Sequence, residues 1–148
     1  MYKDNYNFYT RKGHPINNKL DISLKDVVEY ELCFSILKGF NDNKPIAIDI
    51  LSSLGLDVSV KLRSEVMSIL INYVKHSDAI LLGTETFIMD NKNDVLRVNM
   101  DMDNYDRYNE SEGLYTSLFY HQSNRKNDKT IWLGEMIKSV FRDEGIKI

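Results

Sequence analysis

The chain has 148 residues, of which 43% are hydrophobic and 28% are charged, and its formal net charge is -3. This length suits one compact domain and this composition excludes a disordered chain, so we expect a single α+β domain over residues 1–148. No segment is apolar enough for a signal peptide or a membrane span, which predicts a soluble, cytoplasmic bacterial protein.

The first half of the chain is predicted to be mainly helical. Residues 1–20 hold four basic residues and one acidic residue, and we expect them to form a basic arm or an edge strand. A serine cap and apolar residues at four-residue spacing predict a helix over residues 23–39. A short helix is expected over residues 45–55, although alternating apolar residues leave a strand open over residues 45–62. A third helix is predicted over residues 62–74.

The second half of the chain changes to a two-residue period. Strands are predicted over residues 80–89, 95–103 and 114–122, with a turn rich in Asn and Asp over residues 90–94. A last amphipathic helix is predicted over residues 130–144. The order predicts an α+β domain in which N-terminal helices precede an antiparallel meander of three or more strands. The C-terminal helix is expected to pack on the sheet.

Two metal-binding patterns are incomplete in this sequence. Asp101, Asp103, Asn109 and Glu112 stand at ligand positions of an EF-hand loop, but Asp106 replaces the glycine that its sharp turn requires. Asp101 and Asp103 also share a strand face, as a two-metal nuclease needs, yet the third strand supplies no further carboxylate. The three histidines are too far apart to indicate zinc. We therefore expect no metal and no cofactor.

Motifs for nucleophilic catalysis and phosphate binding are also missing. The only cysteine, Cys33, lies among apolar residues, which indicates a packed structural thiol. The sequence contains no Gly-x-Ser-x-Gly turn and no glycine-rich phosphate loop. These absences favour a protein that is not an enzyme.

His121 carries the one catalytic alternative that stays open. In the predicted third strand it shares a face with Tyr115, Ser117 and Phe119. A small enzyme or nuclease-like domain could use this face together with Asp101, but a general acid or base needs a partner that the sequence does not show.

The N-terminal segment carries a second alternative. Tyr2, Tyr6, Phe8 and Tyr9 alternate with basic residues there, a pattern that suits single-stranded nucleic acid. A regulatory, nucleic-acid-associated protein is therefore possible, although a pI near 5.6 argues against nucleic-acid binding. The other interpretation is a strand whose aromatic rings pack in the core.

The acidic segment over residues 90–112 provides the leading hypothesis. It contains seven acidic and three basic residues, with tyrosines between the charges. Tyrosine is enriched at protein interfaces, and a negative patch steers association with a basic partner. The chain is in overall character similar to immunity proteins, so we expect a non-catalytic inhibitor of a bacterial toxin, such as a nuclease. The partner-binding residues would be Asp101, Asp103, Tyr105, Asp106, Tyr108, Glu110 and Glu112. This hypothesis predicts a basic protein partner, no membrane contact and no small-molecule substrate.

Overall fold

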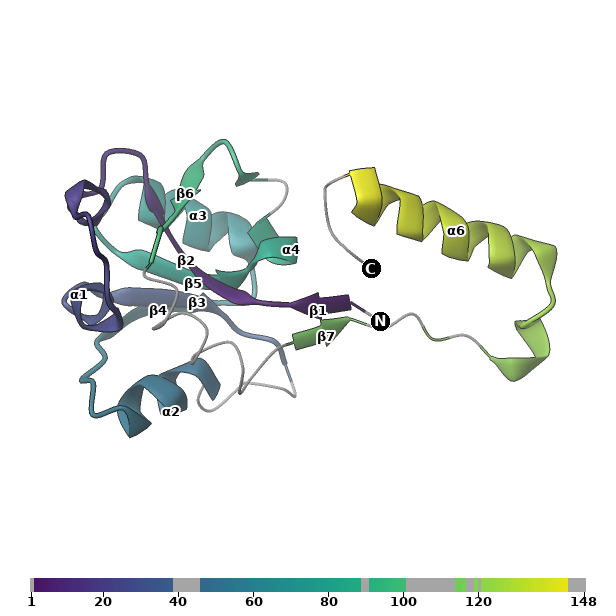
Figure 1. Ribbon diagram of the computed structural model, residues 1–148, viewed down its shortest axis with the longest axis horizontal. Coiled ribbons are helices and arrows are strands. Elements are labelled where there is room, and N and C mark those ends of the chain that lie inside the picture. The colour runs from purple at the N-terminus through teal and green to yellow at the C-terminus, as the bar shows by residue number, and fades with distance from the viewer. Residues whose placement is uncertain are drawn as a thin grey trace. The chain divides into compact units, whose positions relative to one another are not determined.

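Figure 1 shows the computed structural model of the chain. The structure describes residues 2–38, 46–88, 91–100, 114–116, 119 and 121–143. The chain divides into two compact units, one formed by residues 1–4 and 114–148 and the other by residues 5–113. They are called unit 1 and unit 2 below. The expected single domain stays a prediction.

The two units contain the following strands and helices. The strands of unit 2 are β2 (Tyr6–Arg11), β3 (Leu32–Ser35), β4 (Val60–Ser64), β5 (Ile80–Thr84) and β6 (Val95–Arg97). Its helices are η1 (Pro15–Asn18), α1 (Leu24–Val28), α2 (Ile46–Ser53), α3 (Met67–Lys75) and α4 (Glu85–Ile88). Unit 1 contains β1 (Tyr2–Asp4), β7 (Leu114–Thr116), η3 (Gln122–Asn124) and α6 (Asp128–Asp143). Among these described helices, none is long and apolar enough to cross a membrane.

The sheet of unit 2 is mixed, with five strands in the order β4-β3-β5-β2-β6. β3 runs parallel to β4 and to β5, whereas β2 runs antiparallel to β5 and to β6. Tyr9 of β2 pairs with Leu81 of β5 on one side and with Arg97 of β6 on the other. The predicted antiparallel meander is wrong, because the N-terminal strand β2 inserts between β5 and β6. In unit 1, β1 and β7 form a separate antiparallel pair.

Helices cover both faces of this sheet, and Figure 1 shows α2 and α3 on opposite sides of it. All residues of β5 are buried. Leu82 of β5 belongs to a first hydrophobic core together with Leu51 of α2. Leu81 belongs to a second core together with Leu70 of α3. Strands that are buried on both faces form nearly continuous apolar runs, which explains why β5 shows no polar alternation before Thr84.

The predicted N-terminal helices are wrong over much of their length. α1 ends at Val28, and the apolar residues that follow form β3 instead of continuing the helix. Leu32 and Phe34 lie in the first core, whereas Cys33 lies in the second. A strand buried on both faces supplies apolar residues at helical as well as strand spacing, so periodicity alone misassigned it. The third predicted helix begins late, because residues 60–64 form β4 and the helix starts only at Met67.

Other predicted elements agree with the structure or are shorter than expected. The short helix over residues 45–55 is confirmed as α2, and Gly55 beyond its end has a φ of 75°. The last helix is confirmed as α6. The strand predicted over residues 80–89 ends at Thr84, where α4 begins, and the one over residues 95–103 ends at Arg97. The packing of α6 on the sheet stays a prediction.

Asp26 stabilises the start of α1. Its carboxylate accepts hydrogen bonds from the Lys19 ammonium at 2.7 Å, the Ser23 hydroxyl at 2.7 Å and the Ser23 backbone N–H at 2.8 Å. The bond from Lys19, followed by those from Ser23, holds the pKa of Asp26 well below its usual range. Folding therefore favours the charged form of this side chain.

We expect Asp26→Asn to lower the free energy of unfolding at neutral pH by about 1 kcal/mol, as loss of a helix cap does. Because the pKa is lowered in the folded state, this stability is present above the unfolded pKa of about 4 and is lost as the pH falls further. The difference between wild type and variant should therefore shrink on acidification. Urea unfolding at neutral and acidic pH measures it, with the exposed Asp57→Asn as control. An equal difference at both pH values would contradict the assignment.

Cys33 is predicted to be unreactive in the folded protein. Its side chain is fully buried, and this burial raises the pKa of the thiol to about 11. Since the thiolate is the reactive form, a disulfide reagent such as DTNB should modify the native protein far more slowly than the urea-unfolded chain. Equal rates in both states would show that β3 is not enclosed as described.

Candidate functional site

Three neighbouring strands of unit 2 each end in a residue with a hydroxyl group. β3 ends at Ser35, β4 ends at Ser64 and β5 ends at Thr84. Ser35 pairs with Ser64, and the preceding Phe34 pairs with Leu82 of β5. Because these strands are parallel, their carboxyl ends lie along one edge of the sheet. We call Ser35, Ser64 and Thr84 the hydroxyl edge.

The connections that follow β3 and β5 leave this edge on opposite faces of the sheet. After β3 the chain enters α2, whose Leu51 packs in the first core, whereas after β5 it enters α4, whose Ile88 packs in the second core. Adjacent strands whose connections leave on opposite faces form a topological switch point, and open α/β sheets bind their ligands outside the strand ends there. The ends of β3 and β5 form such a point in this sheet.

Thr84 has a feature that packing does not explain. It is 1% exposed, and its hydroxyl has no hydrogen-bond partner within the part of the chain that the structure describes. A buried polar group left without a partner costs roughly 1–3 kcal/mol. Native proteins pair nearly all such groups, so an unpaired hydroxyl at a switch point indicates a missing ligand or water.

The N-terminus of α3 follows Ser64 of the hydroxyl edge closely in the chain. The Ser64 hydroxyl accepts a hydrogen bond of 3.0 Å from the backbone N–H of Val66, and no side chain caps the helix that begins at Met67. Uncapped N–H groups and the helix dipole make such an end favourable for an anion. The side chain of Val66 is 50% exposed and could contact an apolar group of a ligand.

Unit 2 also has a small pocket lined by residues of β2, α4 and β6. Its volume is about 240 Å³, and it is lined by Tyr9, Glu85, Ile88, Lys92, Val95, Leu96 and Arg97. Glu85 follows Thr84 directly in the chain. Drug-sized ligands occupy roughly 300–1,000 Å³, so this volume fits a smaller molecule. The lining combines apolar side chains with charges of both signs.

The residues that the acidic-surface hypothesis selected lie outside the described residues. They are Asp101, Asp103, Tyr105, Asp106, Tyr108, Glu110 and Glu112. Their role in partner binding is not supported by any contact described here. The candidate ligand-binding residues in the structure are instead Ser35, Ser64 and Thr84, which were not selected from the sequence. Ser35 and Thr84 each end a short, mostly apolar segment, whereas Ser64 ends a segment in which apolar and basic residues alternate.

His121 does not lie on a strand with Tyr115. β7 ends at Thr116, and His121 precedes η3 as an exposed residue whose Nδ1 lies 2.7 Å from the hydroxyl of Ser123. Within the described ranges, no three His, Cys, Asp or Glu side chains come together as a metal ion would need. His121 is thus a capping residue at the start of η3.

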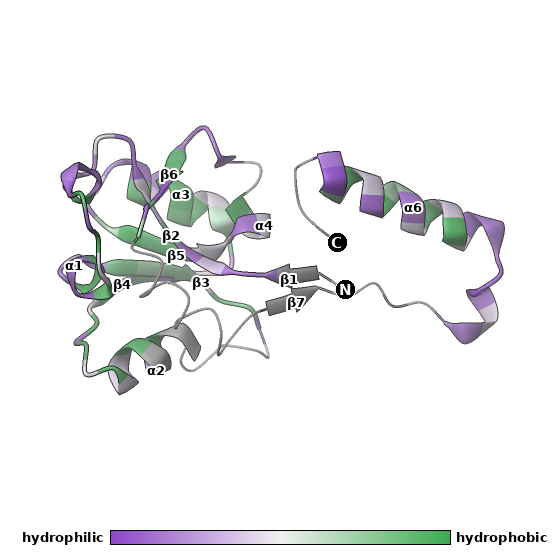
Figure 2. Ribbon diagram, viewed as in Figure 1, coloured by the Kyte–Doolittle hydropathy of each residue, from purple (hydrophilic) through white to green (hydrophobic). Residues whose placement is uncertain are grey.

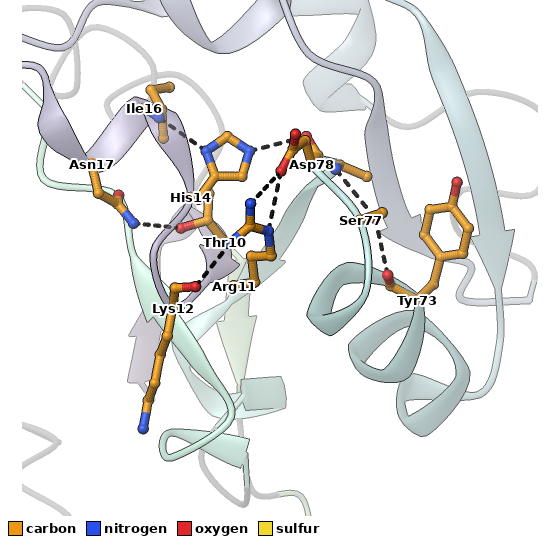
Figure 3. Close-up of polar contacts among 10 residues, drawn as sticks. Thr10, Arg11, Lys12, His14, Ile16, Asn17, Tyr73, Ser77 and Asp78 are labelled. Atoms are coloured by element: carbon orange, nitrogen blue, oxygen red, sulfur yellow. Dashed lines mark hydrogen bonds and ion pairs between the residues drawn. The ribbon is translucent and has the colours of Figure 1, made fainter.

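His14 is fully buried and joins two turns of unit 2, as Figure 3 shows. Its Nδ1 accepts a hydrogen bond from the Ile16 backbone N–H at 3.1 Å, so the ring proton is on Nε2. Nε2 then donates to the Asp78 carbonyl oxygen at 3.0 Å. The Asp78 carboxylate also accepts hydrogen bonds from Arg11 at 2.8 and 3.1 Å. Both ring nitrogens are occupied, which indicates a structural role.

Comparison with solved structures identifies the fold. No protein-family model and no curated protein matches the sequence. A Vibrio parahaemolyticus protein described as a transcriptional regulator matches 96% of this chain at 16% identity, with a TM-score of 0.61, over 61% of its own chain. The BenM effector binding domain, solved with its effector benzoate, matches 99% of this chain at 17% identity, with a TM-score of 0.57, over 63% of its own. The effector binding domain of QuiR, in complex with shikimate, matches 68% of this chain at 14% identity, with a TM-score of 0.52, over 47% of its own.

These likenesses show a shared fold at low sequence identity. Further matching structures are LysR family transcriptional regulators, so this chain has a mixed α/β fold that resembles the effector-binding domains of that family. The chain spans less than two thirds of each of the three structures described above. The resemblance covers 96%, 99% and 68% of this chain in the three structures, but only part of those proteins.

The comparisons correct the functional hypothesis. The predicted immunity protein or toxin inhibitor is wrong, because the structures that share this fold are transcriptional regulators and their effector-binding domains. The expected basic protein partner is wrong for the same reason. The expectation of no small-molecule substrate conflicts with the comparisons as well, since two of these domains were solved with a small molecule.

The unpaired hydroxyl of Thr84 should cost stability in the ligand-free protein. We expect Thr84→Val to leave the free energy of unfolding unchanged or to raise it by about 1 kcal/mol, because the variant removes an unsatisfied polar group. Thr10→Val is the matched control, since the buried Thr10 hydroxyl accepts a hydrogen bond of 3.0 Å from Asn17. The free energy of unfolding of Thr10→Val should fall by about 1 kcal/mol. Urea unfolding compares them, and equal losses would show that the Thr84 hydroxyl is satisfied.

Proposed function

We propose that this chain is a small-molecule-sensing domain of a transcriptional regulator, and that it binds a small organic acid at the hydroxyl edge. The observation that carries the proposal is the buried, unpaired hydroxyl of Thr84 at the switch point of a fold shared with effector-binding domains. A bound ligand would supply the missing hydrogen-bond partner.

The chemistry of the hydroxyl edge favours an acid. The hydroxyl of Thr84, on the sheet face of Leu82, can donate to a carboxylate. Those of Ser35 and Ser64, on the face of Cys33 and Leu62, can do the same beside the uncapped N-terminus of α3, which adds a partial positive charge. The exposed side chain of Val66 offers an apolar contact to the body of such a ligand. Hydroxyls and backbone N–H groups can hold a carboxylate without burying a charged side chain.

The ligands in the compared structures have this chemistry. Benzoate in the BenM domain and shikimate in the QuiR domain are both small ring compounds with one carboxylate. We therefore place the ligand among small cyclic monocarboxylates.

The proposed role requires binding and no chemical step, so we retain the prediction that the chain is not an enzyme. Transcriptional regulators act where the DNA is, and in a bacterium this agrees with the cytoplasmic location predicted from the sequence. The effect of the ligand would be passed to transcription through the regulator as a whole.

The proposal is tested by calorimetric titration of the purified chain with benzoate and shikimate, and with benzamide as an uncharged analogue. We expect a carboxylate to bind and the amide to bind at least tenfold more weakly, because the amide lacks the charge that the α3 N-terminus favours. Thr84→Val should weaken the acid about tenfold, the equivalent of one hydrogen bond. Thr130→Val in α6 is the matched control and should bind as wild type does.

Two results would overturn this proposal. One is an absence of binding by any small cyclic acid at millimolar concentration. The other is binding that is equally strong in wild type and Thr84→Val, which would place the ligand away from the hydroxyl edge.

A further inference from the structure

The small pocket of unit 2 lies away from the Thr84 hydroxyl. Its volume is about 240 Å³, and the residues that line it come from β2, α4 and β6 and from the turn before β6. Three of them, Tyr9, Ile88 and Val95, belong to the second hydrophobic core. Thr84 instead shares a sheet face with Leu82 of the first core. The pocket and the Thr84 hydroxyl are therefore on opposite faces of the sheet.

The floor of this pocket is apolar. Tyr9, Ile88 and Val95 are all buried, and the exposed Leu96 adds an apolar side chain beside them. Side chains of a packed core hold fixed positions, so the floor offers a preformed apolar surface to a ligand.

Charged residues of both signs surround the apolar floor. Glu85 comes from α4, Lys92 from the turn before β6, and Arg97 from β6. All three are exposed, and Figure 2 shows this turn as hydrophilic and the start of β6 as hydrophobic. The pocket thus combines cations, an anion and an apolar surface.

The backbone places two of these charges beside the floor. Arg97 pairs with Tyr9 across β6 and β2, and Val95 lies two residues before Arg97 on the same face. Glu85 and Ile88 are three residues apart in α4, which places them on one side of this helical turn. The positions of Glu85 and Arg97 therefore follow from the packing of Ile88, Tyr9 and Val95.

The turn that carries Lys92 is fixed to α3. The Lys75 ammonium donates a hydrogen bond of 2.8 Å to the Asp94 carboxylate. The Asp94 backbone N–H donates to the Asn91 carbonyl oxygen at 2.9 Å, which closes the turn. These two contacts keep Lys92 at the pocket.

We infer that this pocket binds a small α-amino acid with an apolar side chain. The carboxylate of the ligand binds Lys92 and Arg97, and its ammonium group donates to Glu85. Its side chain packs on the apolar floor. A plain acid would be repelled by Glu85, and a plain amine would be repelled by the two cations, so a zwitterion fits this set of charges best.

The inference goes beyond the proposed function and does not depend on it. Glu85, Lys92 and Arg97 also interact with other groups of the chain, so the amino acid exchanges those partners and binds with modest affinity. Thr84→Val, which should weaken an acid at the hydroxyl edge, should leave the affinity for the amino acid unchanged.

Calorimetric titration of the full chain with L-valine tests the inference. Two analogues are matched to valine, because isovalerate lacks its ammonium group and isobutylamine lacks its carboxylate. We expect valine to bind at least tenfold more tightly than either analogue, since each analogue leaves one sign of charge without a partner. Glycine should also bind at least tenfold more weakly than valine, because it has no apolar side chain to bury. Repeating the titrations in Thr84→Val removes any contribution of the hydroxyl edge.

Two variants assign the charges. Glu85→Gln should weaken valine binding at least tenfold and leave isovalerate binding unchanged or tighter, because Glu85 faces only the ammonium group. Lys92→Gln should weaken the binding of both. Glu29→Gln and Lys12→Gln remove exposed charges outside the pocket and are the matched controls, which should bind valine as wild type does. Circular dichroism establishes that each variant is folded.

Three results would overturn the inference. The first is an absence of valine binding at millimolar concentration. The second is isovalerate that binds as tightly as valine, because the ammonium group would then not be recognised. The third is valine binding that is unchanged in Glu85→Gln or tenfold weaker in Thr84→Val, which would place the amino acid outside this pocket.

Discussion

The structure of unit 2 depends on the burial of β5 between two hydrophobic cores. Since neither face of this strand meets water, helices must cover both sides of the sheet, and the chain has to pass from one face to the other. It does so at the carboxyl ends of β3 and β5. The same requirement that completes the cores therefore creates the switch point, and it places the Thr84 hydroxyl there without a partner in the described structure.

An unpaired hydroxyl in an otherwise well-packed region is a stability cost with a functional explanation. Residues at binding sites often oppose stability because they are arranged to satisfy a ligand instead of the protein. His14 provides the contrast, since it is equally buried but both of its ring nitrogens have partners. Burial of a polar side chain alone therefore does not identify the site; the missing partner does.

The sequence predicted the mixed content of helices and strands, the short helix α2 and the last helix α6. It did not predict the sheet, because strands buried on both faces lack polar alternation and because β2 pairs with segments far away in sequence. A regulatory protein was the second alternative, argued from the aromatic N-terminal segment, yet Phe8 and Tyr9 of that segment are buried in the cores. Ser35 and Thr84 were recognisable as residues that end apolar segments, but Ser64 follows an alternation of apolar and basic residues. Their common edge requires the parallel arrangement, which local patterns do not contain.

The central claim is that a small organic acid binds at the hydroxyl edge. Amide chemical shifts measured by NMR during titration with benzoate or shikimate test it most directly. We predict that the largest shifts fall on Ser35, Ser64 and Thr84 and on the N–H groups of Met67 and Ser68 in the first turn of α3. Saturable shifts confined to other parts of the chain, or no shifts at millimolar ligand, would contradict the proposed site.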